Sequence, residues 1–477
     1  MKFYNREEEL KRLQDTYKNL KNSSQLIVLT GRRRIGKTRL VLASLKERKY
    51  LYFFVEKKNM TNLLESFCEE IREKLNLSIV GKLSNFDELI KILFEYAKKE
   101  GLIVVFDEVS NFRFIDTSVF STLQKYWDTN KETSRICLVF IGSMFTMMKK
   151  IFFDSREPLF GRATLRINLF PLPSSAQKDI LSDLGIFSYP NLLHFYSILG
   201  GVPKYLELIE DLNLAGKSFD RIMDALFFNR DAMLKDEGRL ILIEEFGKKY
   251  PLYFSILQAI ASGKTRRNEI ADACGVSADS IGPYLYELED YYELIERKTP
   301  IFTIKQKSKM SFYRICDHFF RFWFRYIYRY SHFYEIEAYD RLKALVKQDL
   351  ATFEGLSFEE LIREILIELN KKGKFKIAFS RIGSFWSRRG DEIDIVCVDE
   401  ERYQIFFGEC KLSLDKNPET EIQLLKEKSR QVKWKIDERK DTLGLFVLED
   451  VSLWRKQLKD KGMFVFSLRE LLEWIEE

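Results

Sequence analysis

Apolar runs and longer helical segments alternate along the first 170 residues of the chain. Between the runs, apolar residues recur every three or four positions, which is the spacing of an amphipathic helix. Continuous apolar strands joined by helices are typical of a parallel sheet that is covered on both faces. The pattern therefore predicts an α/β domain over residues 1–170. Its predicted strands are 26–30, 50–55, 102–106, 136–141 and 165–169.

Helical periodicity continues through residues 171–246. Leu206, Ile209 and Leu212 have the spacing of one buried helical stripe, and a second stripe begins at Phe219. This segment is predicted to be helical.

A different pattern occupies residues 247–312. Three short amphipathic segments follow one another, with Gly275 at the turn between the second and third and Ser277 at the start of the third. The strand-like segments 293–297 and 311–315 come next and are able to pair. Three helices with a permissive glycine in the turn, followed by a strand pair, predict a winged helix.

The charges of this predicted winged helix bear on its partner. The third helix is acidic and has no lysine or arginine near its exposed start, which opposes the phosphate contacts that supply much of DNA affinity. The predicted wing is basic and offers an alternative contact with DNA. We therefore expect docking or regulation rather than sequence-specific readout. The acidic residues are Asp279, Glu287 and Glu289, and the basic ones are Lys305, Lys307 and Lys309.

Residues 313–354 combine many aromatic side chains with regularly spaced charges. Arg321, Arg325 and Arg329 are four residues apart and share one helical stripe, which leaves the other faces aromatic. The charges argue against a membrane span. Buried packing between domains is the expected role, and base stacking on the aromatics is the alternative.

The last segment, 355–477, carries acids at positions that suggest a metal site. Glu359 lies at the edge of the apolar stripe of a predicted helix and Glu360 on its far side, so Glu359 is the acid able to reach an interior site. Asp394 points to the strand face opposite Ile393, Ile395 and Cys397, while Glu409 and Lys411 share one face of the next strand. Carboxylates that hold Mg²⁺ beside an ammonium group are typical of metal-assisted phosphodiester cleavage. Asp394 and Glu409 are the predicted metal ligands, with Glu392 as the alternative to Asp394.

A phosphate-binding motif lies in the first domain. The sequence GRRRIGKT connects the first predicted strand to a helix, where backbone N–H groups and the helix dipole favour an anion. Lys37 is able to reach the β- and γ-phosphates, and the hydroxyl of Thr38 is able to ligate Mg²⁺. The predicted nucleotide-binding residues include the whole loop and the residue after it: Gly31, Arg32, Arg33, Arg34, Ile35, Gly36, Lys37, Thr38 and Arg39.

Further nucleotide-site residues are predicted at the carboxyl ends of later strands. Asp107 is expected to hold Mg²⁺ and Glu108 to polarise the attacking water. Ser143 is a candidate sensor of the γ-phosphate or the water. Arg162 is a candidate arginine finger, acting within one chain or from a neighbouring subunit, with a solvated loop arginine as the alternative.

Composition narrows the possibilities further. The net charge of +6 arises from 78 basic and 72 acidic residues, so nucleic-acid binding requires local patches. The six cysteines lack paired metal spacing, and three histidines leave little material for a histidine-based zinc site or a catalytic triad. We found neither a signal peptide nor a membrane-spanning run, which predicts a cytoplasmic protein without membrane partners.

The motifs GRRRIGKT, VVFDE, FIGS, LFGRA and GGVPKYL resemble the archaeal ATPase family of AAA+/STAND-type P-loop proteins. This resemblance covers about residues 1–240. It implies a five-stranded ATP-binding core, a helical lid over 171–246, and proximity of residues 201–203 to the nucleotide.

The C-terminal segment resembles the PD-(D/E)XK nuclease superfamily, since Asp394, Glu409 and Lys411 follow its D-x₁₄-E-x-K spacing. Ile393 stands where that motif usually has proline. In the archaeal ATPase family such a domain commonly follows the winged helix.

Together these features predict an α/β multidomain protein: a P-loop ATPase core, a helical lid, a winged helix, an aromatic helical connector and a restriction-endonuclease-like α/β domain. The first functional hypothesis is a Mg·ATP-dependent switch or motor that governs a Mg²⁺ nuclease acting on DNA. A regulatory or signalling ATPase whose inactive nuclease fold only binds partners or DNA is the second. A chaperone-like or toxin-associated ATPase acting on protein is the third, and a homo-oligomer or a protein partner is compatible with each.

Overall fold

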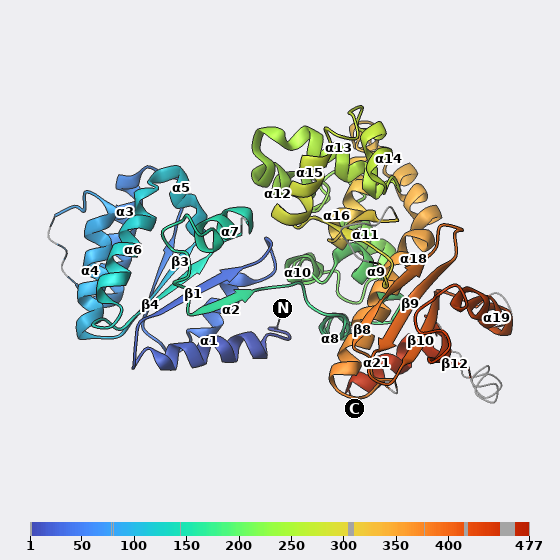
Figure 1. Ribbon diagram of the computed structural model, residues 1–477. Coiled ribbons are helices and arrows are strands. Elements are labelled where there is room, and N and C mark those ends of the chain that lie inside the picture. The colour runs from blue at the N-terminus through green and yellow to red at the C-terminus, as the bar shows by residue number, and fades with distance from the viewer. Residues whose placement is uncertain are drawn as a thin grey trace. The chain divides into compact units, whose positions relative to one another are not determined.

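The computed structural model describes residues 2–77, 79, 81–143, 145–303, 310–375, 377–414, 418–448 and 463–476. The chain forms two compact units. Unit 1 comprises Met1–Pro171 and Val202–Lys204, and unit 2 comprises Leu172–Gly201 and Tyr205–Glu477. Each unit contains a five-stranded sheet (Figure 1).

Unit 1 is built on a parallel sheet with the strand order β2-β3-β4-β1-β5. All five strands predicted from the apolar runs are present. Their bounds are β1 (Gln25–Thr30), β2 (Tyr50–Phe54), β3 (Leu102–Asp107), β4 (Ile136–Ile141) and β5 (Leu165–Asn168).

Helices cover both faces of this sheet, because alternate side chains of each strand point to opposite sides. Leu26 and Val28 of β1 belong to one apolar core, and Ile27 and Leu29 belong to the other. The first core lies under α3 (Met60–Leu75), α4 (Phe86–Lys99), α6 (Ser118–Asn130) and α7 (Phe145–Phe153), while α1 (Glu7–Asn19) and α2 (Lys37–Ser44) cover the second. The short η1 (Val109–Asn111) and α5 (Phe112–Ile115) follow β3.

Unit 2 begins with helices, as the periodicity of residues 171–246 predicts. Buried residues of two of them are those of the predicted stripes, including Leu206 and Ile209, then Ile222, Met223 and Leu226. These helices are α8 (Ser174–Asp183), α9 (Tyr189–Leu199), α10 (Pro203–Asp211), α11 (Phe219–Leu226) and α12 (Glu237–Phe246).

Three short helices and a strand pair follow. Gly275 has the left-handed φ of 66° that its predicted turn requires, and the antiparallel pairing of β6 with β7 confirms the predicted strand pair. Lys305, Lys307 and Lys309 lie outside the described residues. The elements are η2 (Gly247–Lys249), α13 (Tyr250–Ala261), α14 (Arg267–Ala273), α15 (Gly282–Tyr286), the π-helix η3 (Glu287–Tyr291), β6 (Ile295–Lys298) and β7 (Phe312–Ile315).

The aromatic block packs inside unit 2. It forms α16 (His318–Phe322), the π-helix η5 (Trp323–Tyr328) and α17 (His332–Glu335). Its rings contact Phe227 just after α11, Phe254 of α13 and Phe353 of α18, so the expected burial of the aromatics is observed.

The second sheet is mixed, with the order β12-β11-β10-β9-β8 (Figure 1). Strands β8, β9 and β10 are antiparallel neighbours, and β10, β11 and β12 run parallel. The long helix α18 (Tyr339–Lys371) runs without a break across the boundary predicted between residues 354 and 355. The strands are β8 (Arg381–Trp386), β9 (Glu392–Asp399), β10 (Gln404–Lys411), β11 (Lys440–Val447) and β12 (Phe464–Ser467), with helices α19 (Pro418–Ser429) and α21 (Leu468–Glu476).

A β-bulge in β9 corrects one prediction about side-chain facing. The register between β8 and β9 shifts because β9 has one residue more than β8 between two of their paired positions. Ile393 was predicted to share a face with Ile395 and Cys397, but this is wrong, since Ile393 packs in the core cluster of Val396 and Val398. The extra residue shifts the alternation next to Asp394.

No helix within the described ranges combines the length and the apolar character that crossing a bilayer requires.

Candidate functional site

The loop between β1 and α2 has the backbone geometry of an anion cradle. Gly31, Arg34 and Gly36 have positive φ values of 140°, 68° and 88°. A Cβ at Gly31 would lie 2.4 Å from the side chain of Ile35 and 2.6 Å from the carbonyl oxygen of Leu169, so only glycine fits. The loop leads directly into the N-terminus of α2, whose first N–H groups have no partners within the helix.

The side chain of Lys37 is buried and hydrogen-bonded to the backbone of the loop. Its side chain is 7% exposed, and its Nζ donates to the carbonyl oxygens of Gly31 at 2.8 Å and of Arg32 at 2.7 Å. The ammonium group therefore lies where it meets a phosphate bound in the loop. Ile35 is buried beneath the loop, whereas Arg33, Arg34 and Arg39 are exposed.

The structure brings Thr38 and Asp107 together. The hydroxyl of Thr38 donates to Oδ2 of Asp107 at 2.6 Å, and Asp107 is 3% exposed. Thr38 comes from the first turn of α2, and Asp107 is the last residue of β3. The N-terminus of α2 therefore lies at the carboxyl end of β3. A hydroxyl and a carboxylate at this distance fit one Mg²⁺ ion, held by the hydroxyl directly and by the carboxylate directly or through water.

Tyr52 is a member of this site that the sequence did not reveal. Its hydroxyl donates to Oδ2 of Asp107 at 2.7 Å. Burial, followed by the charge of Asp107, raises the pKa of Tyr52 well above its usual value. The available signal was a tyrosine within an apolar strand, since a buried tyrosine hydroxyl usually needs a partner.

Glu108 and Ser143 also meet. Glu108 follows β3 with a φ of 53°, and its two carboxylate oxygens accept from the hydroxyl of Ser143 at 2.7 and 2.8 Å. Ser143 follows β4, the neighbour of β3 in the sheet. The predicted water-polarising acid and the predicted sensor therefore form one hydrogen-bonded pair.

Arg162 is held by a partner of its own. Its guanidinium donates to both carboxylate oxygens of Asp128, at 2.9 and 2.6 Å, and to the carbonyl oxygen of Pro158 at 2.7 Å. The Arg162 hydrogen bonds lower the pKa of Asp128. Among the described residues, none of these contacts joins Arg162 to the P-loop, so its role as an arginine finger stays a prediction.

A second group of charged side chains occupies unit 2. On β10, Lys411 Nζ lies 3.5 Å from Oε1 of Glu409, and Lys428 Nζ of α19 lies 3.0 Å from the same oxygen. Oδ2 of Asp394, on the neighbouring strand β9, accepts from the backbone N–H of Cys410 at 2.8 Å. Asp394 lies near the start of β9, and Glu409 and Lys411 lie at the end of the antiparallel β10. The three side chains are thus brought to the same end of these two neighbouring strands.

The electrostatics of this group are those of crowded carboxylates. Burial, then the charge of Glu409, raises the pKa of Asp394 to about 7. Burial, then the charge of Asp394, raises the pKa of Glu359 to about 8, and burial with the charge of Glu409 raises that of Glu392. Burial lowers the pKa of Lys411 and the charges of Glu409 and Glu421 raise it, with a net upward shift.

The fit of a metal ion to this second group is incomplete. Within the described residues, no three His, Cys, Asp or Glu side chains are arranged to hold a metal ion. However, Oε2 of Glu409 is buried without a hydrogen-bond partner, and Asp394 and Glu359 both have raised pKa values. A cation beside these three groups would relieve both features, so the acids suit a metal but are not arranged around one.

Glu359 and Glu360 have different partners, but Glu360 does not lie on a solvent-facing side of the helix as predicted, since its side chain is only 13% exposed. Glu359 interacts electrostatically with Asp394 and Glu392. Glu360, its neighbour on α18, instead accepts from Arg321 at 2.8 and 3.1 Å and pairs with Arg314. Glu360 therefore belongs to an ion-pair network with Arg314 and Arg321, and Arg314 also interacts electrostatically with Glu359.

Comparisons with known proteins agree with the fold of unit 1. A family described as an ATPase domain predominantly from Archaea matches residues 3–209. A family described as archaeal and bacterial proteins of unknown function matches residues 323–435.

One relative and one solved structure extend the comparison. The chain is 30% identical over 409 residues to an uncharacterized protein of Methanocaldococcus jannaschii. The aligned residues make up 86% of this chain and 87% of the relative. A Walker-type ATPase of Pyrococcus abyssi has a similar fold, with a TM-score of 0.52 and 21% identity over 68% of this chain and 96% of that one.

Proposed function

The chain belongs to the archaeal ATPase family, and on this premise we propose that unit 1 binds and hydrolyses ATP with Mg²⁺. The observation that carries the proposal is the 2.6 Å hydrogen bond between Thr38 and Asp107 beside the buried Lys37. Lys37 and the loop N–H groups would hold the phosphates. Thr38 and Asp107 would hold Mg²⁺, which when bound offsets phosphate charge.

Glu108 would act on the attacking water. A carboxylate is able to orient and polarise a water molecule when it lies within hydrogen-bond reach. Its partner in the present arrangement is Ser143, so catalysis requires Glu108 to exchange that hydroxyl for water or to use its second oxygen.

ATP turnover by the full-length protein tests this proposal. Lys37→Ala removes the ammonium group and should abolish both binding of ATP and its hydrolysis. Glu108→Gln keeps the phosphate cradle and should still bind ATP, with turnover reduced about 100-fold or more, the usual contribution of a general base. Lys46→Gln, at an exposed residue beyond the end of α2, is the control and should hydrolyse ATP like the wild type. Turnover that survives both Lys37→Ala and Glu108→Gln would refute the assignment.

For unit 2 we propose a metal-dependent nuclease of the PD-(D/E)XK type. The proposal is supported by the mixed five-stranded sheet and by the meeting of Asp394, Glu409 and Lys411 at one of its edges. Glu359 from α18 adds a fourth charged group. Asp394 and Glu409 would hold the metal, Lys411 would orient the attacking water, and the helices with the strand pair at residues 247–312 would form a winged helix beside it.

The nuclease proposal is tested by incubation of linear, supercoiled and branched DNA with the protein and Mg²⁺ or Mn²⁺. Cleavage should disappear in Asp394→Ala and in Lys411→Ala. Glu401→Gln, at an exposed acid in the turn between β9 and β10, should cleave like the wild type.

A second candidate function has an observation of its own. Among the described residues the acids form no ready metal-ligand set, and Oε1 of Glu409 is already paired with Lys411 and Lys428. This arrangement favours a regulatory ATPase whose C-terminal sheet binds partners or DNA without cutting. A wild-type protein that hydrolyses ATP but never nicks any of these substrates would select this candidate.

A further inference from the structure

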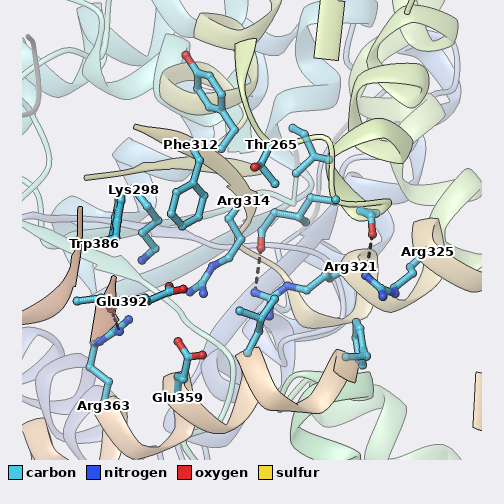
Figure 2. A pocket seen from close by; sticks show the side chains of 18 residues that line it. Thr265, Lys298, Phe312, Arg314, Arg321, Arg325, Glu359, Arg363, Trp386 and Glu392 are labelled. Atoms are coloured by element: carbon cyan, nitrogen blue, oxygen red, sulfur yellow. Dashed lines mark hydrogen bonds between the residues drawn. The ribbon is translucent and has the colours of Figure 1, made fainter. Parts of the chain in front are cut away.

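A cavity of about 130 Å³ lies inside unit 2, next to the acids of the second sheet. Its walls come from α13, the strand pair β6 and β7, the start of the aromatic block, α18 and the strands β8 and β9. The side chains that line it are shown in Figure 2. Glu359 in its wall also belongs to the proposed nuclease site, but neither proposed reaction makes use of the cations that line this cavity.

Five cationic side chains from separate elements line the cavity. Figure 2 shows Lys298, Arg314 and Arg363 directed toward one space, with Arg321 and Arg325 farther along the wall. They come from β6, β7, α18, α16 and η5 respectively. Because these elements are far apart in the sequence, the gathering of positive charge is a product of the fold and not of a local basic run.

Several of these arginines retain unused hydrogen-bonding capacity. The Nε atoms of Arg314, Arg321 and Arg363 are buried and donate to no acceptor. Arg321 is 6% exposed, and Nε of Arg314 lies 3.4 Å from Glu296 without forming a hydrogen bond. A buried donor without an acceptor is costly, and each such group in a folded protein calls for an explanation. An acceptor-rich ligand would supply the missing partners.

The carboxylates near the cavity do not pair one to one with its cations. Glu360 serves both Arg314 and Arg321, and Glu296 serves Lys298 and also lies near Arg314. Arg363 donates to neutral acceptors, the hydroxyl of Ser384 at 2.7 Å and the carbonyl oxygen of Asp394 at 3.3 Å. Arg325 has its own carboxylate partner, Asp349, whereas the other four cations share a carboxylate or lack one.

Repulsion between the cations lowers the pKa values of two of them. Burial, then the charge of Arg314, lowers the pKa of Lys298. Burial and next the charge of Arg314 lower the pKa of Arg321 to about 9. A bound anion would oppose both shifts, since it stabilises the charged forms.

The two carboxylates in the cavity wall mark its side toward the proposed nuclease site. Glu359 interacts with Asp394, and Glu392 interacts with Glu409.

Size and shape restrict the ligand. A volume of about 130 Å³ has room for a few water molecules or one tetrahedral anion with an attached carbon. Phe312 and Trp386, whose ring centroids are 5.0 Å apart, form an apolar part of the wall. Guanidinium groups match the geometry of phosphate oxygens and bind them in pairs.

We propose that this cavity binds a phosphomonoester, either the terminal phosphate of a nucleic-acid strand or the phosphate of a free mononucleotide. The strand-end form rests on the proposed nuclease function and would place a strand end beside Glu359 and Asp394. The site would select substrates by the chemistry of their ends.

Binding without cleavage tests the proposal. Full-length protein carrying Lys37→Ala, which removes the P-loop contribution, is titrated in EDTA with labelled single-stranded DNA that bears a 5′-phosphate, a 3′-phosphate or neither. One phosphorylated form should bind about tenfold more tightly than the unphosphorylated form, since charge-assisted hydrogen bonds contribute at least that much. Lys298→Gln and Arg314→Gln should abolish the preference. Lys298 is partly exposed on a short strand, so its variant also covers the case in which Arg314→Gln does not fold.

Arg297→Gln is the matched control, because Arg297 neighbours Lys298 on β6 but does not line the cavity. AMP is the second probe, read as an increase in melting temperature. AMP stabilisation that depends on Lys298, without a preference among the DNA strands, would identify the free nucleotide as the ligand. The proposal is overturned if neither probe responds, or if Arg297→Gln loses as much as Lys298→Gln. A preference for phosphorylated ends in a protein that never cuts DNA would support the cavity and refute only the nuclease.

Discussion

At the scale of single residues, Asp394 predicts how stability depends on pH. Burial and the charge of Glu409 hold its pKa at about 7 in the fold, against about 3.9 in an unfolded chain. Between these values the folded state binds more protons than the unfolded state. The free energy of unfolding should therefore decrease as the pH rises from about 4 to about 7.

Asp394→Asn removes this dependence. In EDTA, the free energy of unfolding of the variant should increase relative to that of the wild type by roughly 1–3 kcal/mol as the pH rises from 5 to 8. Each unit of pKa shift corresponds to about 1.4 kcal/mol. Urea unfolding followed by tryptophan fluorescence measures this gain, because five of the six tryptophans have positions in unit 2. Glu401→Gln should show no such gain. A difference between Asp394→Asn and the wild type that does not change with pH would contradict the prediction.

Among the site residues, those whose positions follow from strand order were predictable. Thr38 follows β1 and Asp107 ends β3, and a parallel sheet gathers the carboxyl ends of its strands at one edge. Tyr52 was not predictable, because a tyrosine in an apolar strand does not reveal which acid its hydroxyl meets. The Asp128 partner of Arg162 was missed for the same reason, since it lies 34 positions away in the sequence.

At the scale of elements, the two neighbouring acids of α18 should respond oppositely to the same substitution. Glu360→Gln leaves the buried Arg321 and Arg314 without their carboxylate. Breaking a buried pair from one side costs about 3–5 kcal/mol, so we expect a large fall in the urea midpoint of unit 2.

Glu359→Gln is the matched control for this substitution. It replaces the preceding residue of the same helix. Burial, and then the charge of Asp394, raises the pKa of Glu359 to about 8, and the substitution removes this repulsion between carboxylates. At pH 8 this variant should be as stable as the wild type or more so. Equal loss of stability in both variants would contradict the expected difference between the two acids.

Periodicity predicted elements better than their limits and local irregularities. Continuous apolar runs predicted the strands of unit 1, and two strand-like segments predicted the antiparallel pair β6 and β7. They did not reveal the bulge that moves Ile393 to the face of Val396 and Val398, because a bulge adds one residue without changing the apolar character of the strand. They also did not reveal that α18 continues through Gly355, where Phe353 and Phe358 are buried on either side of the glycine.

At the scale of the whole molecule, the chain itself links the two units. It passes between them after Pro171, Gly201 and Lys204. The short excursion Val202–Lys204 belongs to unit 1, and the N–H of Lys204 donates to the carbonyl oxygen of Arg34 in the P-loop at 3.4 Å. A change in the loop on ATP binding would therefore reach α10 through this hydrogen bond, and from α10 the chain continues into unit 2.

This route predicts separable effects of variants at the two sites. Asp394→Ala alters a residue of unit 2 that, within the described part of the chain, shares no partner with the P-loop residues, so ATP turnover should stay within about twofold of the wild type, while DNA cleavage is lost. Glu108→Gln should bind ATP without rapid turnover, so its cleavage should respond to added ATP even though little ATP is consumed. Lys37→Ala, which cannot bind ATP, should cleave at one rate with or without it.

Parallel assays of phosphate release and DNA nicking measure all three variants. Cleavage by Glu108→Gln that ignores ATP would show that the nucleotide does not govern unit 2 through binding, because this variant retains the Lys37 cradle and lacks only the acid that activates water.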